Sequence, residues 1–341
     1  MSDNSIASVA VETPVKEKKQ PVKRARDFVN DPLEMKILFG DLKGLVVNIV
    51  KILILIGVSY VILSPIIGMF VNSISSNKDA YNPMVFVLPQ FPTLERYALA
   101  WERLDYIPTM AADLLYTLSI TVIQVLICSM VGYGFARFEF PLKKFLFACV
   151  VVMIVIPTHT IMLPLYMTFR AFDPLGLCTL IFGGSLNLMS TTIPIYIMTI
   201  LGTGVRSGLY IYIFNQFFRG LPKEIEEAAF VDGAGTWYTY FGIMLKNASP
   251  AVITVTVFSI VWQFNDTFYA NLFLVPDSIV ISKKIASLQA TIATLDKILT
   301  PTIQELYLDA GIILVLLPIV LIYLVLQRSF IEGVERSGIV G

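Results

Sequence analysis

Histidine, cysteine and charged residues are all scarce in this sequence of 341 residues. The only histidine is His159, and the cysteines Cys128, Cys149 and Cys178 lie in apolar stretches without CxxC spacing, so neither a zinc site nor a disulfide framework is predicted. Lysine plus arginine equals aspartate plus glutamate at 25 each, which leaves no bulk charge to attract nucleic acid. A GxxxxGK[ST] phosphate loop is absent, so no ATP site and no cofactor are expected in this chain.

Apolar side chains are abundant instead. Hydrophobic residues make up 56% of the chain and charged residues 15%, and the mean hydropathy is +0.75, which is more apolar surface than a water-soluble core can bury. Six stretches approach the roughly 20 apolar residues that cross a bilayer as a helix, at residues 48–71, 112–136, 145–168, 195–218, 248–274 and 308–327. None shows the alternation of a barrel strand. The sequence therefore predicts an all-α, polytopic bundle of six transmembrane helices, surrounded by the lipid of the cell membrane.

The distribution of basic residues predicts the orientation of this bundle. Residues 1–45 are polar and rich in lysine and arginine, so we expect a largely disordered cytoplasmic tail. With six spans, most basic residues of the connections fall on the side of the tail, which places both termini in the cytoplasm. The first span and an extracytoplasmic loop would then occupy residues 46–110, and the main transmembrane domain residues 111–341.

Residues 175–218 leave two alternatives open. The stretch is apolar but interrupted by glycines, so it could hold one span or two. Two spans would weaken the charge asymmetry between the two sides. The preferred prediction is one span, with residues 176–194 as an interfacial or re-entrant piece packed against protein.

The longest cytoplasmic connection, residues 219–247, predicts two short helices joined by a glycine turn. Pro222 suits a first helical position, and several acids follow it at the positive end of the helix. Asp232-Gly233 predicts a helix stop, because glycine adopts the left-handed conformation needed there. Thr236 is a candidate cap for the next helix, which should run into the fifth span.

Within this connection, Glu227-Ala228-Ala229 followed by Asp232-Gly233-Ala234 and an aromatic helix resembles the EAA loop of bacterial ABC importer permeases. In that family the loop docks on an ATP-hydrolysing subunit. The resemblance implies ATPase-coupling roles for Glu226, Glu227, Ala228, Ala229, Asp232, Gly233 and Ala234. Similarities at residues 133–141, 286–289 and 327–341 favour the carbohydrate branch, and within it the maltose-type second permease. Lys246 replaces the family's usual proline, so a more continuous helix out of the loop is expected.

The resemblance implies a transport subunit and not an enzyme. The chain would form half of a pathway for di- or oligosaccharides, with a homologous second permease, two ATP-binding cassette subunits that use ATP and magnesium, and an extracytoplasmic sugar-binding protein. Two alternatives remain, an ion-gradient-driven secondary transporter and an ABC permease for a non-sugar solute. The first usually shows more membrane-embedded carboxylates than Asp266 alone.

Polar residues within the predicted spans are candidates for substrate contact, because hydrocarbon disfavours them unless they are paired or face water. Asn265 is the best candidate, with aromatic side chains nearby on which a sugar ring can lie. The tentative pathway set is Asn265, Asp266, Gln263, Phe264, Tyr269 and Gln124, with Arg206 as a weaker candidate. Hydrogen bonding between helices is the alternative role for each polar member.

Overall fold

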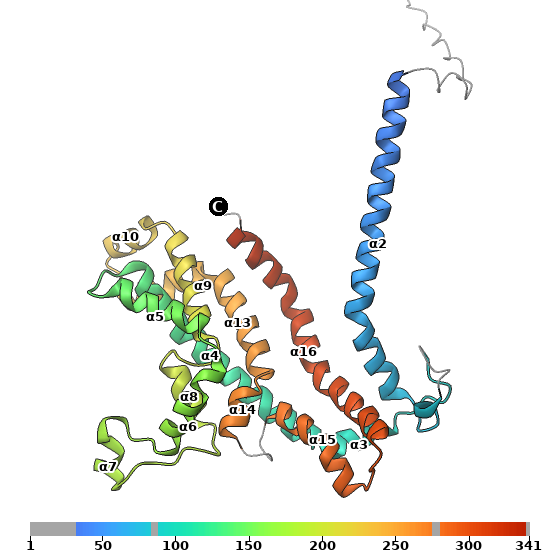
Figure 1. Ribbon diagram of the computed structural model, residues 1–341. Coiled ribbons are helices and arrows are strands. Elements are labelled where there is room, and N and C mark those ends of the chain that lie inside the picture. Colours follow the sequence, from blue (N-terminus) through green and yellow to red (C-terminus); the bar gives the residue numbers. More distant parts are fainter. Residues whose placement is uncertain (1–31, 83–87, 275–279, 339–341) are drawn as a thin grey trace, which may run out of the picture. The chain divides into compact units, whose positions relative to one another are not determined.

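The computed structural model describes residues 32–82, 88–274 and 280–338, and this part of the chain is almost entirely helical (Figure 1). The chain divides into two units, residues 1–66 and 67–341. The helices are α2 (Pro32–Ile74), η1 (Asp79–Tyr81), α3 (Glu95–Arg103), α4 (Tyr106–Arg137), α5 (Lys143–Val155), η2 (Thr158–Ile161), α6 (Met162–Arg170), η3 (Pro174–Gly176), α7 (Leu177–Phe182), α8 (Ile193–Ile200), α9 (Ser207–Gly220), α10 (Glu224–Val231), α11 (Thr236–Tyr238), η4 (Thr239–Met244), α12 (Leu245–Asn247), α13 (Ser249–Phe264), α14 (Phe268–Phe273), α15 (Ile281–Leu295) and α16 (Pro301–Gly338). The predicted all-α class is confirmed for these residues.

Three helices are long and apolar enough to cross a membrane alone. They are α2 over Lys43–Ile74, α4 over Tyr106–Arg137 and α16 over Pro301–Val325. Two further pairs qualify together but are bent, Lys143–Val155 with Thr158–Arg170 by 106° and Thr236–Asn247 with Ser249–Phe264 by 78°. The described residues thus hold three to five candidate spans, and the prediction of six stays a prediction.

The first helix begins earlier than the sequence suggested. Helix α2 starts at Pro32, so residues 32–45, which the sequence assigned to a largely disordered tail, are helical. Proline suits a first helical position, and the leucine, glutamate, methionine and lysine that follow are good helix formers. The rest of the predicted tail, residues 1–31, lies outside the described residues, as do 339–341 of the family-like ending. The predicted domain boundaries at residues 45 and 110 stay predictions.

The predicted span over residues 195–218 is broken. Helix α8 ends at Ile200 and α9 begins at Ser207. Between them Gly202 has φ 70° and Arg206 has φ 56°, a left-handed conformation that cannot continue an α-helix. The sequence shows the glycines but not the left-handed arginine, which is why one continuous helix was expected.

Residues 171–192 form an excursion from the bundle. Phe172 and Leu186 exchange two backbone hydrogen bonds of 2.8 and 3.0 Å, and the six-residue helix α7 lies between them. Its apolar tip is unpacked, since Leu175 is 98% and Leu180 81% exposed. Within this subunit the described residues do not cover that tip, so the expectation that the whole piece packs against protein stays a prediction there.

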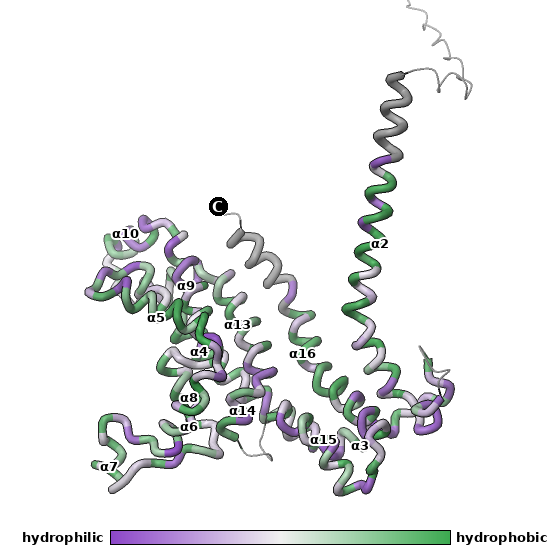
Figure 2. The backbone as a smooth tube through the Cα atoms, in the orientation of Figure 1, coloured by the Kyte–Doolittle hydropathy of each residue, from purple (hydrophilic) through white to green (hydrophobic). Residues whose placement is uncertain are grey.

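Helix α4 is the central element of the second unit. Its two ends and its middle contribute to three separate apolar clusters, with Met110 in the first, Ile120 in the second and Cys128 in the third. Its closest neighbour is α9, and the approach depends on Gly132, where a Cβ atom would lie 2.6 Å from the Cβ of Phe214. Small residues of this kind let membrane helices approach closely. Green, apolar residues are frequent along the coloured part of α16 in Figure 2.

An ion pair joins two elements at the opposite end of the unit from α10. Arg103 of α3 donates three hydrogen bonds to Asp296, from Nη2 to Oδ1 at 2.6 Å and from Nε to Oδ2 at 2.9 Å and to Oδ1 at 3.2 Å. The hydrogen bonds from Arg103 hold the pKa of the Asp296 carboxyl below its usual value. Planar bidentate pairing of this kind fixes orientation as well as charge, so α3 and the end of α15 are held together here.

Candidate functional site

The connection after α9 folds as the sequence predicts in its first half. Helix α10 follows Pro222-Lys223 and carries its acids in the first turn. Gly233 has φ 82°, and two hydrogen bonds close the helix end, from Ala234 N to Ala229 O at 2.9 Å and from Gly233 N to Phe230 O at 3.0 Å. This pair of bonds is a Schellman motif. The predicted helix and its glycine stop are confirmed.

The second half of the connection differs from the prediction. Gly235, and not Thr236, precedes α11, and no side chain caps that helix, so the proposed Thr236 cap is wrong. The chain then passes through the π-helical turn η4 into α12 and bends by 78° before α13. Pro250 lies in the first turn of α13. Because proline has no backbone N–H, it cannot donate a hydrogen bond to a carbonyl oxygen of the preceding helix. The expectation of a more continuous helix out of the loop is therefore wrong.

A buried ion pair ties α10 to the bundle. Glu226 is only 8% exposed, and its Oε2 lies 3.2 Å from Nε of Arg137, in the last turn of α4. Arg137 also donates a hydrogen bond of 2.8 Å to the carbonyl oxygen of Leu221. Sequence reasoning assigned Glu226 to partner contact and gave Arg137 no role. The sequence signal that could have revealed this ion pair is the position of Arg137, a basic residue at the end of a predicted span.

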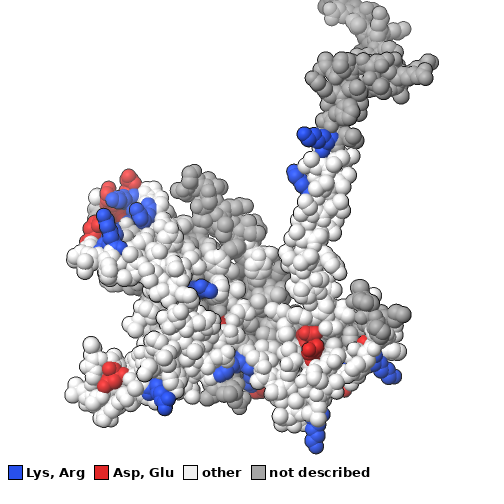
Figure 3. Space-filling model, in the orientation of Figure 1, with Lys and Arg blue, Asp and Glu red and all other residues white. Residues whose placement is uncertain are grey.

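The opposite face of the connection is exposed. Glu227 and Ala228 point outward on α10, whereas Ala229 is buried. Asp232 and Gly233 are exposed, Ala234 is half-buried, and Val231 is 86% exposed. Lysine, arginine, aspartate and glutamate side chains crowd this end of the unit in Figure 3. An exposed apolar patch bordered by acidic side chains, as on this face of α10, is typical of a protein-binding site.

Two of the tentative pathway residues are buried between helices. Gln124 of α4 accepts a hydrogen bond of 2.7 Å from Ser259 of α13 and donates one of 3.0 Å to Ser207 of α9. Gln263 of α13 donates one of 3.3 Å to the hydroxyl of Tyr116. These glutamines therefore join helices in this subunit.

The remaining tentative pathway residues lie around the break between α13 and α14. Asp266 accepts hydrogen bonds from the backbone of Tyr269 at 3.1 Å and of Ala270 at 3.2 Å, and so caps α14. Phe264 and Tyr269 are buried, and Asn265 is exposed. Their contact with a substrate stays a prediction.

An exposed arginine lies on an aromatic ring nearby. The guanidinium carbon of Arg206, at the break before α9, lies 4.2 Å from the ring centroid of Trp262 on α13. Among the residues described, no carboxylate forms an ion pair with Arg206. The buried side chain of Gln124 donates a hydrogen bond to the carbonyl oxygen of Val205, which stabilises the break between α8 and α9.

The whole-chain comparisons agree with this architecture. Residues 124–336 match the family described as the binding-protein-dependent transport system inner membrane component. The chain belongs to this family. It is therefore a multi-pass, inner-membrane permease subunit and not an enzyme, and the long apolar helices are consistent with this location.

Several curated relatives are carbohydrate permeases. The diacetylchitobiose uptake permease NgcG of Streptomyces coelicolor is 25% identical over 279 residues, covering 82% of this chain and 84% of the relative. The melibiose/raffinose/stachyose import permease MelC of Bacillus subtilis is 26% identical over 279 residues, covering 81% and 91%. The chain is thus similar, over most of its length, to permeases whose names give a carbohydrate as the transported solute.

A solved structure shares the fold. A chain of a bacterial ABC transporter that imports the acidic polysaccharide alginate matches with a TM-score of 0.66 and 20% identity, over 84% of this chain and 98% of that chain. The arrangement of helices in the permease is thus one already seen in an ABC importer.

Proposed function

We propose that this permease forms half of the pathway of an ATP-driven importer for di- or oligosaccharides, and that α10 couples it to a separate ATPase. The observation that carries the proposal is the two-sided build of α10. Glu226 is locked inside the subunit by Arg137, while Glu227 and Ala228 face outward. One face thus transmits movement to the bundle, and the other is free to receive a partner.

The proposed topology has six spans and cytoplasmic termini. Counting the two bent pairs and the broken α8–α9 pair as one span each, beside α2, α4 and α16, gives this number. The excess of basic residues on the side of α10 favours a cytoplasmic position for that end. A homologous second permease, two ATP-binding cassette subunits that use ATP and magnesium, and an extracytoplasmic sugar-binding protein complete the proposed assembly.

The outward face of α10 gives a direct test of coupling. Ala228→Leu is expected to leave the subunit folded, because Ala228 is exposed, but to weaken association with a co-expressed ATP-binding cassette subunit by at least about tenfold, as for a bulky group in a packed interface. Co-purification and sugar-stimulated ATP hydrolysis measure the effect. Ala228→Ser, which keeps a small side chain, is the matched control. Wild-type association of the leucine variant would contradict coupling through this face.

Arg206 and Trp262 are proposed to line the translocation pathway. Helix α9 has 14 residues, so Arg206 lies about 21 Å from its cytoplasmic end, well inside a hydrocarbon layer of about 30 Å. An exposed arginine at this depth must face water or protein and not lipid. Its guanidinium and the indole beneath it offer hydrogen-bond donors and an aromatic face, which are the groups that recognise sugar hydroxyls and rings.

Removal of this arginine should affect transport without affecting folding. Arg206→Ala is expected to raise the KM of sugar uptake about tenfold, the effect of one lost hydrogen bond to a charged group. Uptake into cells is measured with labelled diacetylchitobiose, melibiose and raffinose, sugars taken from the names of the relatives. Arg206→Lys, which keeps the charge but not the planar donors, should fall between. Unchanged KM in both variants would remove Arg206 from the pathway.

A further inference from the structure

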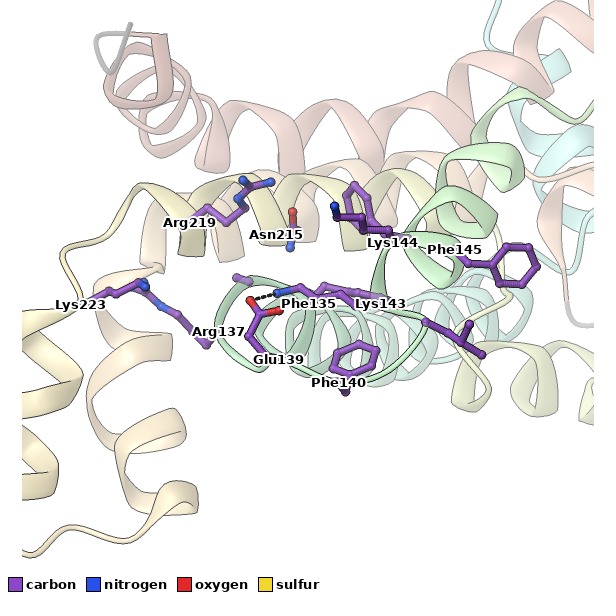
Figure 4. A pocket seen from close by; sticks show the side chains of 13 residues that line it. Phe135, Arg137, Glu139, Phe140, Lys143, Lys144, Phe145, Asn215, Arg219 and Lys223 are labelled. Atoms are coloured by element: carbon purple, nitrogen blue, oxygen red, sulfur yellow. Dashed lines mark hydrogen bonds and ion pairs between the residues drawn. The ribbon is translucent and has the colours of Figure 1, made fainter.

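A large cavity among the described residues lies beside α10 and is strongly basic (Figure 4). It has a volume of about 840 Å³ and lies where the end of α4, the start of α5 and the end of α9 meet. Its lining includes five basic side chains and one acid, namely Arg137, Lys143, Lys144, Arg219, Lys223 and Glu139. The cavity therefore carries an excess of positive charge in a confined space.

Only part of this charge is balanced within the protein. Arg137 pairs with Glu226, and Lys143 donates a hydrogen bond of 2.8 Å to Glu139. The hydrogen bond from Lys143, together with the charges of the nearby lysines, holds the pKa of the Glu139 carboxyl below its usual value, so this carboxylate is ionised at neutral pH. Three cations are left over.

The unbalanced cations are exposed at the mouth of the cavity. Lys144, Arg219 and Lys223 form no ion pair with any described residue. In the view of Figure 4, Lys144 and Arg219 lie along one side of the Lys143–Glu139 pair, and Phe140 lies on the other. The cavity thus presents free positive charge on one rim and an aromatic ring on the opposite rim.

Apolar side chains next to the basic rim point outward. Leu142 and Phe145 line the cavity and are 72% and 64% exposed. Leu142 ends the short turn between α4 and α5, so these residues lie at the end of two membrane helices, where lipid headgroups meet acyl chains. A free anion in water needs no such apolar border, whereas a phospholipid presents an anionic headgroup and acyl chains together.

We propose that this cavity binds the headgroup of an anionic phospholipid, with the phosphate between Lys144, Arg219 and Lys223 and the acyl chains along Leu142 and Phe145. Its assignment to the cytoplasmic leaflet rests on the proposed topology. Basic cavities between membrane helices on this side are suited to anionic lipids. Lys223 immediately precedes α10, so the lipid holds the start of the coupling helix against α5.

Lipid retention by the purified, full-length permease tests the site without an ATPase or a sugar. The protein is reconstituted in nanodiscs of phosphatidylglycerol and phosphatidylcholine, then extracted, and the bound lipid is counted by native mass spectrometry. Wild type is expected to retain phosphatidylglycerol at least tenfold over phosphatidylcholine. The triple variant Lys144→Gln, Arg219→Gln and Lys223→Gln is expected to lose about a hundredfold in affinity, from roughly one lysine or arginine contribution at each position.

The matched control removes the same charge at the other end of the molecule. Lys78→Gln, Arg170→Gln and Lys297→Gln should retain phosphatidylglycerol as wild type does, because these residues lie outside the cavity. If the cavity triple variant aggregates, single Arg219→Gln and Lys144→Gln variants carry the test with an expected loss of about fivefold each.

Three results would overturn the assignment. They are equal loss of lipid in both triple variants, wild-type retention in the cavity variant, and displacement of phosphatidylglycerol by millimolar inorganic phosphate, which would indicate a soluble anion. Because the measurement needs neither ATP nor sugar, failure here leaves the proposed import function untouched. Failure of sugar uptake, conversely, leaves the lipid measurement valid.

Discussion

Gly132→Val is expected to prevent the permease from accumulating as a folded subunit. A Cβ atom at this position would lie 2.6 Å from the Cβ of Phe214 and 3.0 Å from backbone atoms of Asn215 and Ile211. Backbone atoms cannot move aside as a flexible side chain can, so α9 would have to separate from α4. We expect a cost of about 3 kcal/mol or more, the upper part of the range for overpacked cores.

The same helix supplies the control for this prediction. Gly134 lies two residues further along α4, and a Cβ atom there meets nothing within 4 Å. Gly134→Val should therefore leave the melting temperature in detergent and the yield of monodisperse protein close to wild type. At Gly311 the nearest atoms are the ends of the Ile285 and Leu288 side chains, which can turn away, so Gly311→Ala should cost less than Gly132→Ala. Equal behaviour of the Gly132 and Gly134 variants would contradict the close contact of α4 with α9.

Loss of Glu226 is the second change with a large expected effect. Its side chain and that of Arg137 are almost completely buried, so Glu226→Ala leaves an unpaired guanidinium in the protein. Removal of one partner from a buried pair costs about 3–5 kcal/mol. Since α10 depends on this contact, we expect early proteolysis within residues 219–247 and a lower melting temperature. Glu227→Ala, one residue further on the exposed face, should show neither effect.

A double-mutant cycle separates the pair from the individual side chains. Arg137→Met alone should destabilise the subunit as much as Glu226→Ala does, because it leaves the Glu226 carboxylate buried without its partner. The double variant Arg137→Met/Glu226→Gln removes both charges and should recover most of the stability, since a buried pair often contributes little beyond its own desolvation. Losses that simply add would show that the two side chains act separately.

The sequence predicts the helices that are long and continuous, and it fails where the backbone turns. Spans α2, α4 and α16 follow from unbroken apolar runs. The break before α9 depends on a left-handed conformation at Arg206, a residue type that usually avoids it, and that conformation is supported by hydrogen bonds from Gln124, which is distant in sequence. Tertiary contacts of this kind leave no local signal.

At the candidate site the motif fixed the location but not the direction of each side chain. Glu226 and Glu227 are adjacent acids, and the sequence predicts contact with the ATPase equally for both. The structure buries the first against Arg137 and exposes the second. The Thr236 cap failed for a similar reason, because several residues near a glycine turn satisfy the same local rule and packing selects among them.

The unequal attachments of α10 determine how a push on it spreads. On one side the ion pair between Glu226 and Arg137 attaches it to α4, and Arg137 also donates a hydrogen bond to the carbonyl oxygen of Leu221. On the other side it is connected to α13 through a π-helical turn and a 78° bend. Under the proposed coupling, a displacement of α10 is therefore expected to reach α4 directly through the Arg137–Glu226 pair, and to reach α13 through this bend and through the hydrogen bond between Ser259 and Gln124 of α4.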